Sequence, residues 1–214
     1  MKRKIIGIGA GGHAKVVIDA FRLRGEFEFY GLLDSNRLLH GKTINGVLVL
    51  GDDALLPSLY RDGIRHVFIG IGGIADMSAR QTVYDKVVGL GFEVAGVRHP
   101  CACISPSAII EDSVQVMACA VINADARIGK NVIVNTGAIV EHGCNISMNV
   151  HVASGAIVTG GVTVGPGAFI GAGAVIKNSV NIGARAVVGA GAAVIRDVPD
   201  NIVVAGVPAR PIRL

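Results

Sequence analysis

Two histidines, His142 and His151, lie in the stretch IVEHGCNISMNVHVASG at residues 139–155, and the second half of the chain contains no other histidine. From His142 to Ile176 the sequence has no Asp, Glu, Lys or Arg. An imidazole titrates near neutral pH, so it can serve as a general base, as a metal ligand or as a packed group. Which chemistry these rings perform depends on the structure that carries them.

That structure is predicted by a repeat of six residues. An aliphatic residue recurs every six positions from Ile104 to Val194, and all sixteen of these anchors are Ile or Val. The residue four positions after each anchor is always Ala, Val or Cys, and the residue directly after an anchor is often Gly, as at Gly129. We predict that each hexad forms one short strand and a tight bend, that three hexads complete a triangular turn, and that anchors and small residues point inward.

The first part of the chain has a different pattern, in which apolar strands alternate with helical segments. Strands are expected at 4–10, 27–35, 64–73 and 92–97, and helices at 13–23 and 76–91. This alternation predicts a small, Rossmann-like α/β domain with a parallel sheet. We divide the chain into an α/β domain at 1–98 and a parallel β-helix at 99–214, whose end is capped by the tail DNIVVAGVPARPIRL.

A glycine motif at the start of this α/β domain predicts a binding site for a phosphorylated ligand. Gly7, Gly9 and Gly12 fit the pattern GxGxxG between a strand and a helix, and Asp34 follows about twenty residues later. Glycines allow a phosphate or a sugar to approach the backbone, and a helix N-terminus favours negative charge. The motif suits NAD and equally suits a nucleotide-sugar.

Five segments spread over the whole chain carry a resemblance to one group of enzymes: GAGGHAKVV, HPCACISPSAII, VINADARIG, NTGAIVEH and AGVPAR. They resemble the nucleotide-4-amino-sugar N-acetyltransferases of the PglD type and the similar NeuD-type sialic acid O-acetyltransferases. The resemblance implies a left-handed β-helix, acetyl-CoA as acetyl donor, and a 4-amino-4,6-dideoxy sugar on a nucleotide as acceptor in surface-polysaccharide or glycoprotein synthesis. It also implies a homotrimer with active sites between adjacent prisms, and it makes a nucleotide-sugar a better ligand than NAD.

The same resemblance assigns roles to single residues. His142 matches the catalytic base, which removes a proton from the sugar amine, and His151 matches a contact to the thioester region of acetyl-CoA. One position departs from the family, since Gly143 stands where an acidic residue commonly follows the base. The remaining matches are CoA contacts at Ala172 and Ala190 and nucleotide contacts at Gly11, Gly12, His13, Asp34, Ser35 and Gly72.

Other classes of function are disfavoured. The β-helix carbonic anhydrases need three zinc-binding histidines where this repeat has two, so we expect no metal. We expect no nucleic-acid partner, because the basic residues are scattered, and no membrane insertion, because the uncharged stretch is Gly-rich. The four cysteines form no CxxC pair and predict reduced, mostly packed thiols in a cytoplasmic protein. O-acetylation of a sialic acid or related sugar, and a non-catalytic protein that binds nucleotide-sugar or CoA, stay open as alternatives.

Overall fold

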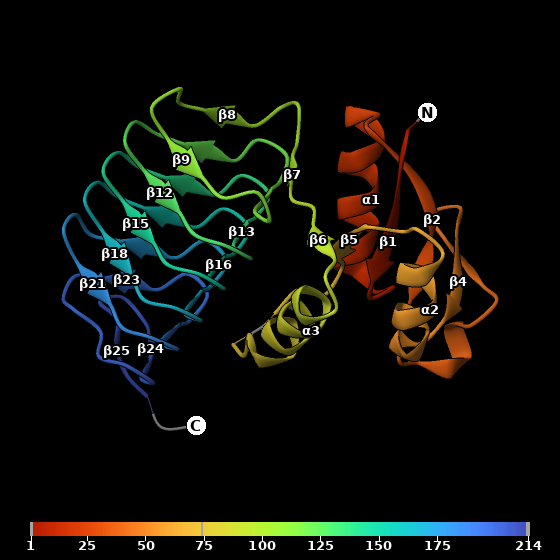
Figure 1. The fold of residues 1–214 in the computed structure, drawn as a ribbon. Coiled ribbons are helices and arrows are strands. Elements are labelled where there is room, and N and C mark those ends of the chain that lie inside the picture. Colours follow the sequence, from red (N-terminus) through yellow and green to blue (C-terminus); the bar gives the residue numbers. More distant parts are fainter. Residues whose placement is uncertain (1, 74, 213–214) are drawn as a thin grey trace.

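Two units lie side by side in the computed structural model, which describes residues 2–73 and 75–212 (Figure 1). The first part of the chain forms an α/β unit, and the rest forms a long prism of stacked coils. Helix α3 (Ser78–Gly89) lies between the two. The predicted succession of an α/β fold and a parallel β-helix is confirmed.

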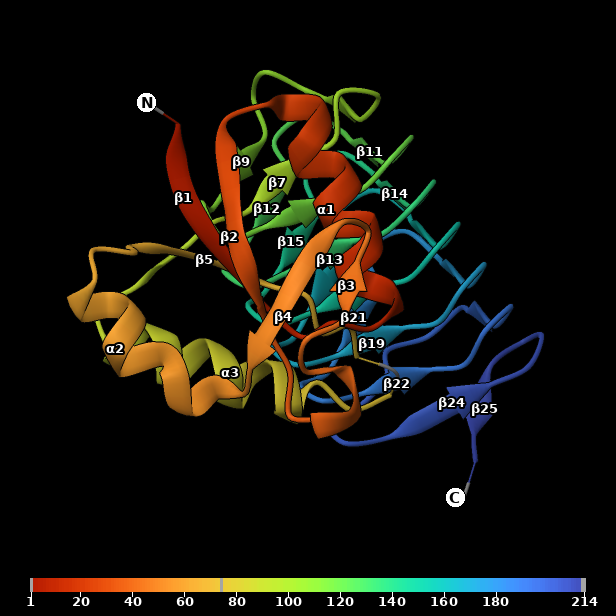
Figure 2. The same ribbon diagram turned by 90° about the vertical axis from the view of Figure 1, so that its right-hand side faces the viewer.

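The α/β unit is built on a six-stranded sheet with the order β3-β4-β2-β1-β5-β6, in which only the β3–β4 pair is antiparallel. Helix α1 packs on one side of the sheet, and α2 and α3 pack on the other (Figure 2). Helix α1 ends at Gly25, whose φ of 69° forms a left-handed cap. The elements are β1 (Arg3–Ile8), α1 (Gly12–Arg24), β2 (Phe27–Leu33), η1 (Arg37–Leu39), β3 (Thr43–Ile44), β4 (Val47–Gly51), η2 (Asp53–Leu55), α2 (Leu56–Arg61), β5 (His66–Ile69) and β6 (Glu93–Val94).

The prism has three faces, each a stack of two-residue parallel strands in which partners are 18 residues apart, as in Ile139 and Ile157. Face 1 consists of β7 (Val97–Arg98), β10 (Gln115–Val116), β13 (Ile133–Val134), β16 (His151–Val152), β19 (Phe169–Ile170) and β22 (Val187–Val188), and it is extended by β24 (Val203–Ala205) and β25 (Arg210–Pro211). Face 2 consists of β8 (Cys103–Ile104), β11 (Val121–Ile122), β14 (Ile139–Val140), β17 (Ile157–Val158), β20 (Val175–Ile176) and β23 (Ala193–Val194). Face 3 consists of β9 (Ile109–Ile110), β12 (Arg127–Ile128), β15 (Asn145–Ile146), β18 (Thr163–Val164) and β21 (Asn181–Ile182).

The interior of the prism is filled by the two residue sets that the repeat predicts. Anchors such as Val140 and Val158 and small residues such as Ala138 and Cys144 form one continuous buried cluster. Glycines directly after an anchor relieve crowding between coils, since a Cβ atom at Gly165 would lie 2.6 Å from a backbone nitrogen of the next coil. These predictions are confirmed.

The corners of the prism have a second regular feature that the sequence analysis missed. The third residue after the anchor has a positive φ in thirteen successive hexads, from Cys119 (φ 57°) to Gly191 (φ 65°). Glycine adopts this left-handed conformation without steric cost, and Asn and Asp tolerate it. Each coil therefore turns its corner at a fixed point of the hexad.

Two expectations about the chain outside the repeat need correction. The segment 92–97 was predicted as one strand of the sheet, but it divides: β6 joins the sheet of the α/β unit, and β7 pairs with β10 in the prism. The hairpin β3–β4 and helix α2 were not predicted, although Asn45-Gly46 between apolar residues is a hairpin signal. The division at residues 98 and 99 stays a proposal.

The predicted cap at the C-terminal end of the prism is present in the described part of the tail. Strand β24 pairs with β22 on face 1, and the backbone N–H of Ala209 donates to the carbonyl of Ala193 on face 2 at 2.8 Å. Val198 bridges to Ile182 on face 3. The tail therefore pairs with the last strands of faces 1 and 2, and Val198, two residues before the tail, pairs with the last strand of face 3.

Candidate active site

His142 lies two residues after the end of strand β14, at the corner between face 2 and face 3. Its side chain is exposed, and among residues 2–73 and 75–212 its imidazole has no hydrogen-bond partner, since only its backbone N–H and carbonyl are bonded. The ring lies against Gly160 of the next coil, where a Cβ atom would come within 2.6 Å of both Cε1 and Nε2. Within this chain, the position of the His142 ring is set by its packing against Gly160.

The neighbours of His142 in the sequence do not orient the imidazole. Gly143 has a φ of 65° and occupies the left-handed corner position, which explains why a glycine fits there. The carboxylate of Glu141 accepts a hydrogen bond of 3.2 Å from the backbone N–H of His142. An exposed imidazole at a corner is accessible to a substrate and is free to accept a proton.

His151 points from face 1 toward the α/β unit and is 6% exposed. Its Nδ1 lies 2.7 Å from the carbonyl oxygen of Gly73, which can only accept, so Nδ1 carries the proton and donates. Its Nε2 then accepts from the side-chain amide of Asn135 at 3.1 Å, and the ring meets Phe169 edge to face at 5.3 Å. Both ring nitrogens are engaged inside the chain, and the contact of His151 with acetyl-CoA stays a prediction.

His13, in the first turn of α1, is also turned toward the prism. Its Nε2 donates to the side-chain oxygen of Gln115 at 2.8 Å, and the amide nitrogen of Gln115 donates to the carbonyl of Ile69 at 2.8 Å. Gln115, on strand β10, thereby links the start of α1 to the end of β5. A direct contact of His13 with a nucleotide stays a prediction.

Arg80 completes this network between the two units and was not recognised in the sequence. Its side chain is 1% exposed and donates to the carbonyls of Ile69 (3.1 Å), Ile71 (2.7 Å) and Asn131 (3.3 Å). Burial lowers the pKa of Arg80 to about 9. The guanidinium fixes the loop after β5, which contains Gly72, to the prism.

The two histidines of this network are held in the neutral form. Burial, and to a lesser degree the positive charge of Arg80, lowers the pKa of His13 and of His151 to about 4. The hydrogen bond to Gln115 opposes the shift for His13, and the bond to Gly73 opposes it for His151, but neither outweighs burial. In mildly acidic solution the unfolded chain therefore binds protons at His13 and His151 that the folded protein does not bind.

We expect the protein to lose stability on acidification through this effect. Between pH 6.5 and about 4 the unfolded state binds more protons than the folded state, so the free energy of unfolding falls as the pH falls through this window. Each histidine contributes on the order of 3 kcal/mol at full shift. Urea unfolding at pH 7.5, 6 and 4.5 measures the slope, and His151→Gln should flatten it. An equal slope in wild type and variant would contradict the assignment.

The predicted nucleotide residues gather at the carboxyl edge of the sheet. Gly11 and Gly12 begin α1, and a Cβ atom at either would meet no atom within 4 Å, so packing does not require glycine there. Gly72 lies close to His13, because a Cβ atom at Gly72 would be 3.6 Å from the Cβ of His13. The first turn of α1 has no acidic residue and no side-chain cap, which leaves its N–H groups open to an anion.

Asp34 supports the glycine loop of this region. Its Oδ2 accepts from the backbone N–H of Ala10 at 2.7 Å, and its Oδ1 accepts from that of Asn36 at 2.8 Å. A cavity of about 310 Å³ beside it is lined by Gly9 and Ser35 among others. Strand β1 lies between β2 and β5, so this cavity is at the switch point where open α/β sheets bind ligands.

Ala172 and Ala190, the predicted CoA contacts, are exposed at the corner between face 1 and face 2. The backbone carbonyl of Ala172 accepts from Gly191 at 2.8 Å, so the two alanines lie on adjacent coils. His142 is at the other edge of face 2. The structure thus has the predicted base and the predicted CoA contacts on opposite edges of one face and does not bring them together within a single chain.

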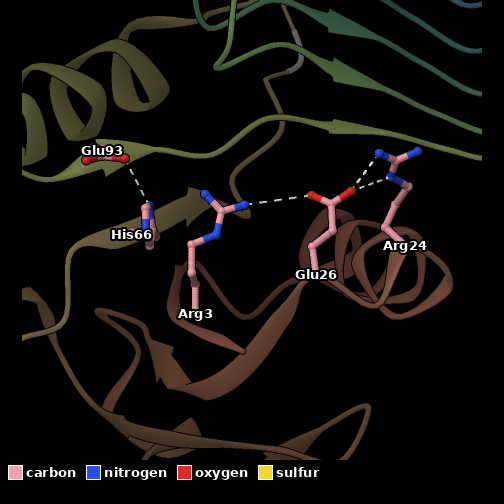
Figure 3. Close-up of polar contacts among 5 residues, drawn as sticks. All are labelled: Arg3, Arg24, Glu26, His66 and Glu93. Carbon is pink, nitrogen blue, oxygen red and sulfur yellow. Dashed lines mark hydrogen bonds and ion pairs between the residues drawn. The ribbon is translucent and has the colours of Figure 1, made fainter. Parts of the chain in front are cut away.

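Another cavity, of about 610 Å³, lies at the opposite edge of the sheet and contains none of the predicted site residues. Figure 3 shows four of its lining residues with the neighbouring Arg24: Glu26 pairs with Arg24 at 2.6 Å and with Arg3 at 4.0 Å, and Glu93 lies 3.2 Å from His66. The carboxylate of Glu26 therefore already has two cationic partners within the chain. We assign no role in the reaction to this cavity.

The prediction that the cysteines are mostly packed is wrong. All four thiols are free, but Cys101, Cys103 and Cys119 are exposed and only Cys144 is buried. Cys103 is on the outer side of face 2, and Cys119 occupies a left-handed corner position, so the repeat turns both outward. Burial raises the pKa of the Cys144 thiol, which donates to the carbonyl of Thr159 at 3.1 Å. This thiol near His142 is therefore a poor nucleophile.

In the described ranges no three His, Cys, Asp or Glu side chains form a group that could hold a metal ion. Within the same ranges no helix has both the length and the apolar character to cross a membrane.

Known families and solved structures place the fold and site in a class. The PglD N-terminal domain matches residues 4–87, and the hexapeptide repeat of succinyl-transferase matches residues 120–154 and 161–196. Among curated proteins, none matches the chain. A left-handed parallel β-helix joined to this α/β unit, with a histidine at a prism corner, is the architecture of a hexapeptide-repeat acyltransferase.

Solved structures narrow this class to a family. PerB from Caulobacter crescentus, in complex with CoA and GDP-perosamine, is 40% identical, and the match covers 98% of this chain and 97% of that one with a TM-score of 0.91. The acetyltransferase domain of PglB from Neisseria gonorrhoeae, with acetyl coenzyme A, is 34% identical over 99% of this chain and 100% of that one, with a TM-score of 0.89. The chain belongs to the PglD-type acetyltransferases.

Proposed function

We propose that the protein transfers the acetyl group of acetyl-CoA to the 4-amino group of a nucleotide-linked 4-amino-4,6-dideoxy sugar. One observation carries this proposal: the site residues fall into three groups that match the parts of such a reaction. An open glycine-rich helix start suits a diphosphate, a corner lined by Ala172 and Ala190 leaves room for a thin cofactor arm, and His142 is an accessible base. The relative PerB is named an N-acetyltransferase and binds CoA and GDP-perosamine.

The proposed step is a direct transfer. The amine is largely an ammonium ion at neutral pH, so it must lose a proton before it can attack the thioester carbonyl, and His142 accepts that proton. The carbon–sulfur bond breaks as the amide bond forms, and the departing CoA thiolate takes up the second proton that the attacking nitrogen loses, so CoA leaves as a thiol. A covalent acetyl-enzyme on Cys144 is disfavoured by the raised pKa and the burial of that thiol.

We further propose that the protein works as a homotrimer and that each active site lies between two copies. The outward residues of face 2 form an apolar ladder of Val121, Ile139, Ile157 and Val175, of which Val175 is 41% exposed in the single chain. The outward residues of face 3 are mostly polar and exposed: Arg127, Asn145, Thr163 and Asn181. Packing face 2 of three copies around one axis buries the ladder and lets the His142 edge of one copy meet the alanine edge of its neighbour.

A cytoplasmic location is part of the same proposal. Three exposed free thiols are expected to persist only in a reducing compartment.

Acceptor assays with the purified protein test the reaction. It is incubated with acetyl-CoA and, in turn, GDP-, UDP- and dTDP-linked 4-amino sugars and a sialic acid, and the release of CoA thiol and the mass of the product are followed. We expect acetylation of an amino sugar and a raised melting temperature with the matching nucleoside diphosphate. Acetylation of hydroxyl acceptors alone, or ligand binding without turnover, would reject the proposal in favour of O-acetyl transfer or of a binding protein.

A further inference from the structure

Gly160 lies directly against the imidazole of His142, one coil further along the prism. A Cβ atom at Gly160 would lie 2.6 Å from Cε1 and 2.6 Å from Nε2 of the ring, far inside the usual contact distance. The next nearest atom is Cδ2 of the same ring, at 3.3 Å. All three of the closest atoms therefore belong to the one side chain that we propose as the base.

The repeat gives an independent sign that this glycine is specific. Gly160 occupies the second position after its anchor, and in the sixteen hexads it is the only glycine at that position. Every other hexad has a side chain there: Pro106, Asp112, Ala118, Ala124, Lys130, Thr136, His142, Met148, Ser154, Pro166, Ala172, Asn178, Ala184, Ala190 and Arg196. The exception falls in the coil that lies against His142.

The backbone does not require glycine at this position. Gly161 has a φ of 69°, as expected for the left-handed corner, whereas Gly160 is outside the positive-φ region that disfavours side chains. The carbonyl of Gly160 accepts from the backbone N–H of Ser179 at 3.0 Å, a bond that any residue can make. Only the ring of His142 explains the absence of a side chain.

We propose that Gly160 is a positioning residue: its bare backbone is the surface on which the His142 imidazole lies, and it sets where Nε2 points. This inference rests on the proposed function of His142. A methyl group at residue 160 would displace the Nε2 edge of the ring by about 1 Å to restore van der Waals contact. Because His142 is exposed, the ring can move away at little cost to folding. The base is then misplaced in a protein that is still correctly folded.

The variant Gly160→Ala tests this directly. We expect kcat to fall roughly 10- to 100-fold, because a misplacement of about 1 Å can cost two orders of magnitude in rate. The KM for the nucleotide-sugar, the oligomeric state and the melting temperature should stay as in wild type. Gly89→Ala is the matched control, since a Cβ atom at Gly89, at the end of α3, meets no atom within 4 Å. It should leave all four quantities unchanged.

A double-mutant cycle with His142→Ala separates positioning from a general structural effect. If Gly160 acts through the ring, adding Gly160→Ala to His142→Ala should cause no further loss of kcat. An equal additional loss in both backgrounds, or a wild-type kcat for Gly160→Ala while His142→Ala is inactive, would overturn the inference. Full activity of His142→Ala would instead reject the proposed base.

Discussion

Replacing His142 by alanine is expected to lower kcat by about 10²- to 10⁴-fold, the usual contribution of a positioned general base. The KM for both substrates should change little, because the imidazole accepts a proton from the amine and does not hold either substrate in place. The melting temperature should not fall, since the side chain is exposed and its ring has no hydrogen-bond partner in the described chain. Steady-state kinetics with each substrate varied in turn measures the effect.

His99→Ala is the matched control for this prediction. His99 follows β7 in the first coil of the prism, and its Nδ1 accepts from the backbone N–H of Cys101. It should keep wild-type kcat. A loss of similar size in both variants would point to general damage, and a rate for His142→Ala within a few-fold of wild type would show that another group accepts the proton.

Replacing Ile157 by glutamate is expected to abolish the trimer and with it nearly all activity. Ile157 is in the middle of the apolar ladder of face 2 and points outward. A carboxylate at each of three symmetry-related positions would have to be buried without a partner, at a cost of several kcal/mol per subunit. The interior of the prism would be untouched, so the chain should remain folded as a monomer.

Sedimentation velocity, circular dichroism and turnover check this expectation together. Thr163→Glu introduces the same charge on the exposed, polar face 3 and should leave a trimer of normal activity. A monomeric but fully active Ile157→Glu protein would show that each chain contains a complete site. A trimeric Ile157→Glu protein would show that another face forms the contact.

The prism could be predicted from the sequence because each hexad repeats the same local rule. Inward residues such as Val140 and Ala138 must be aliphatic or small in every coil, so the packing leaves a periodic trace in the sequence. The assignment of His142 to an accessible corner follows from that register. The hairpin β3–β4 was not predicted because the alternation of strands and helices outweighed the local signal of Asn45-Gly46.

The contacts between the two units could not be predicted in the same way. Arg80 belongs to a helix of mixed polarity, SARQTVYDKVVG, where a charged residue is expected on the solvent side. Its burial depends on carbonyls such as those of Ile71 and Asn131, which come together only after both units have folded. Every residue has a backbone carbonyl, so the sequence does not indicate which carbonyls will accept a hydrogen bond from a buried side chain such as Arg80.

The constant spacing of 18 residues between stacked coils gives the prism a simple system of coordinates. Registers such as Ile139 with Ile157 and Val121 with Ile139 mean that a residue's number states its corner and its height along the axis, in steps of about 4.8 Å. His142 and Gly160 are 18 residues apart, so they occupy the same corner on adjacent coils, and the same arrangement could be built at any other height of the prism. Insertions of whole coils can therefore move an active site along the prism without redesigning it, whereas any insertion that is not a multiple of six shifts every later side chain out of its place.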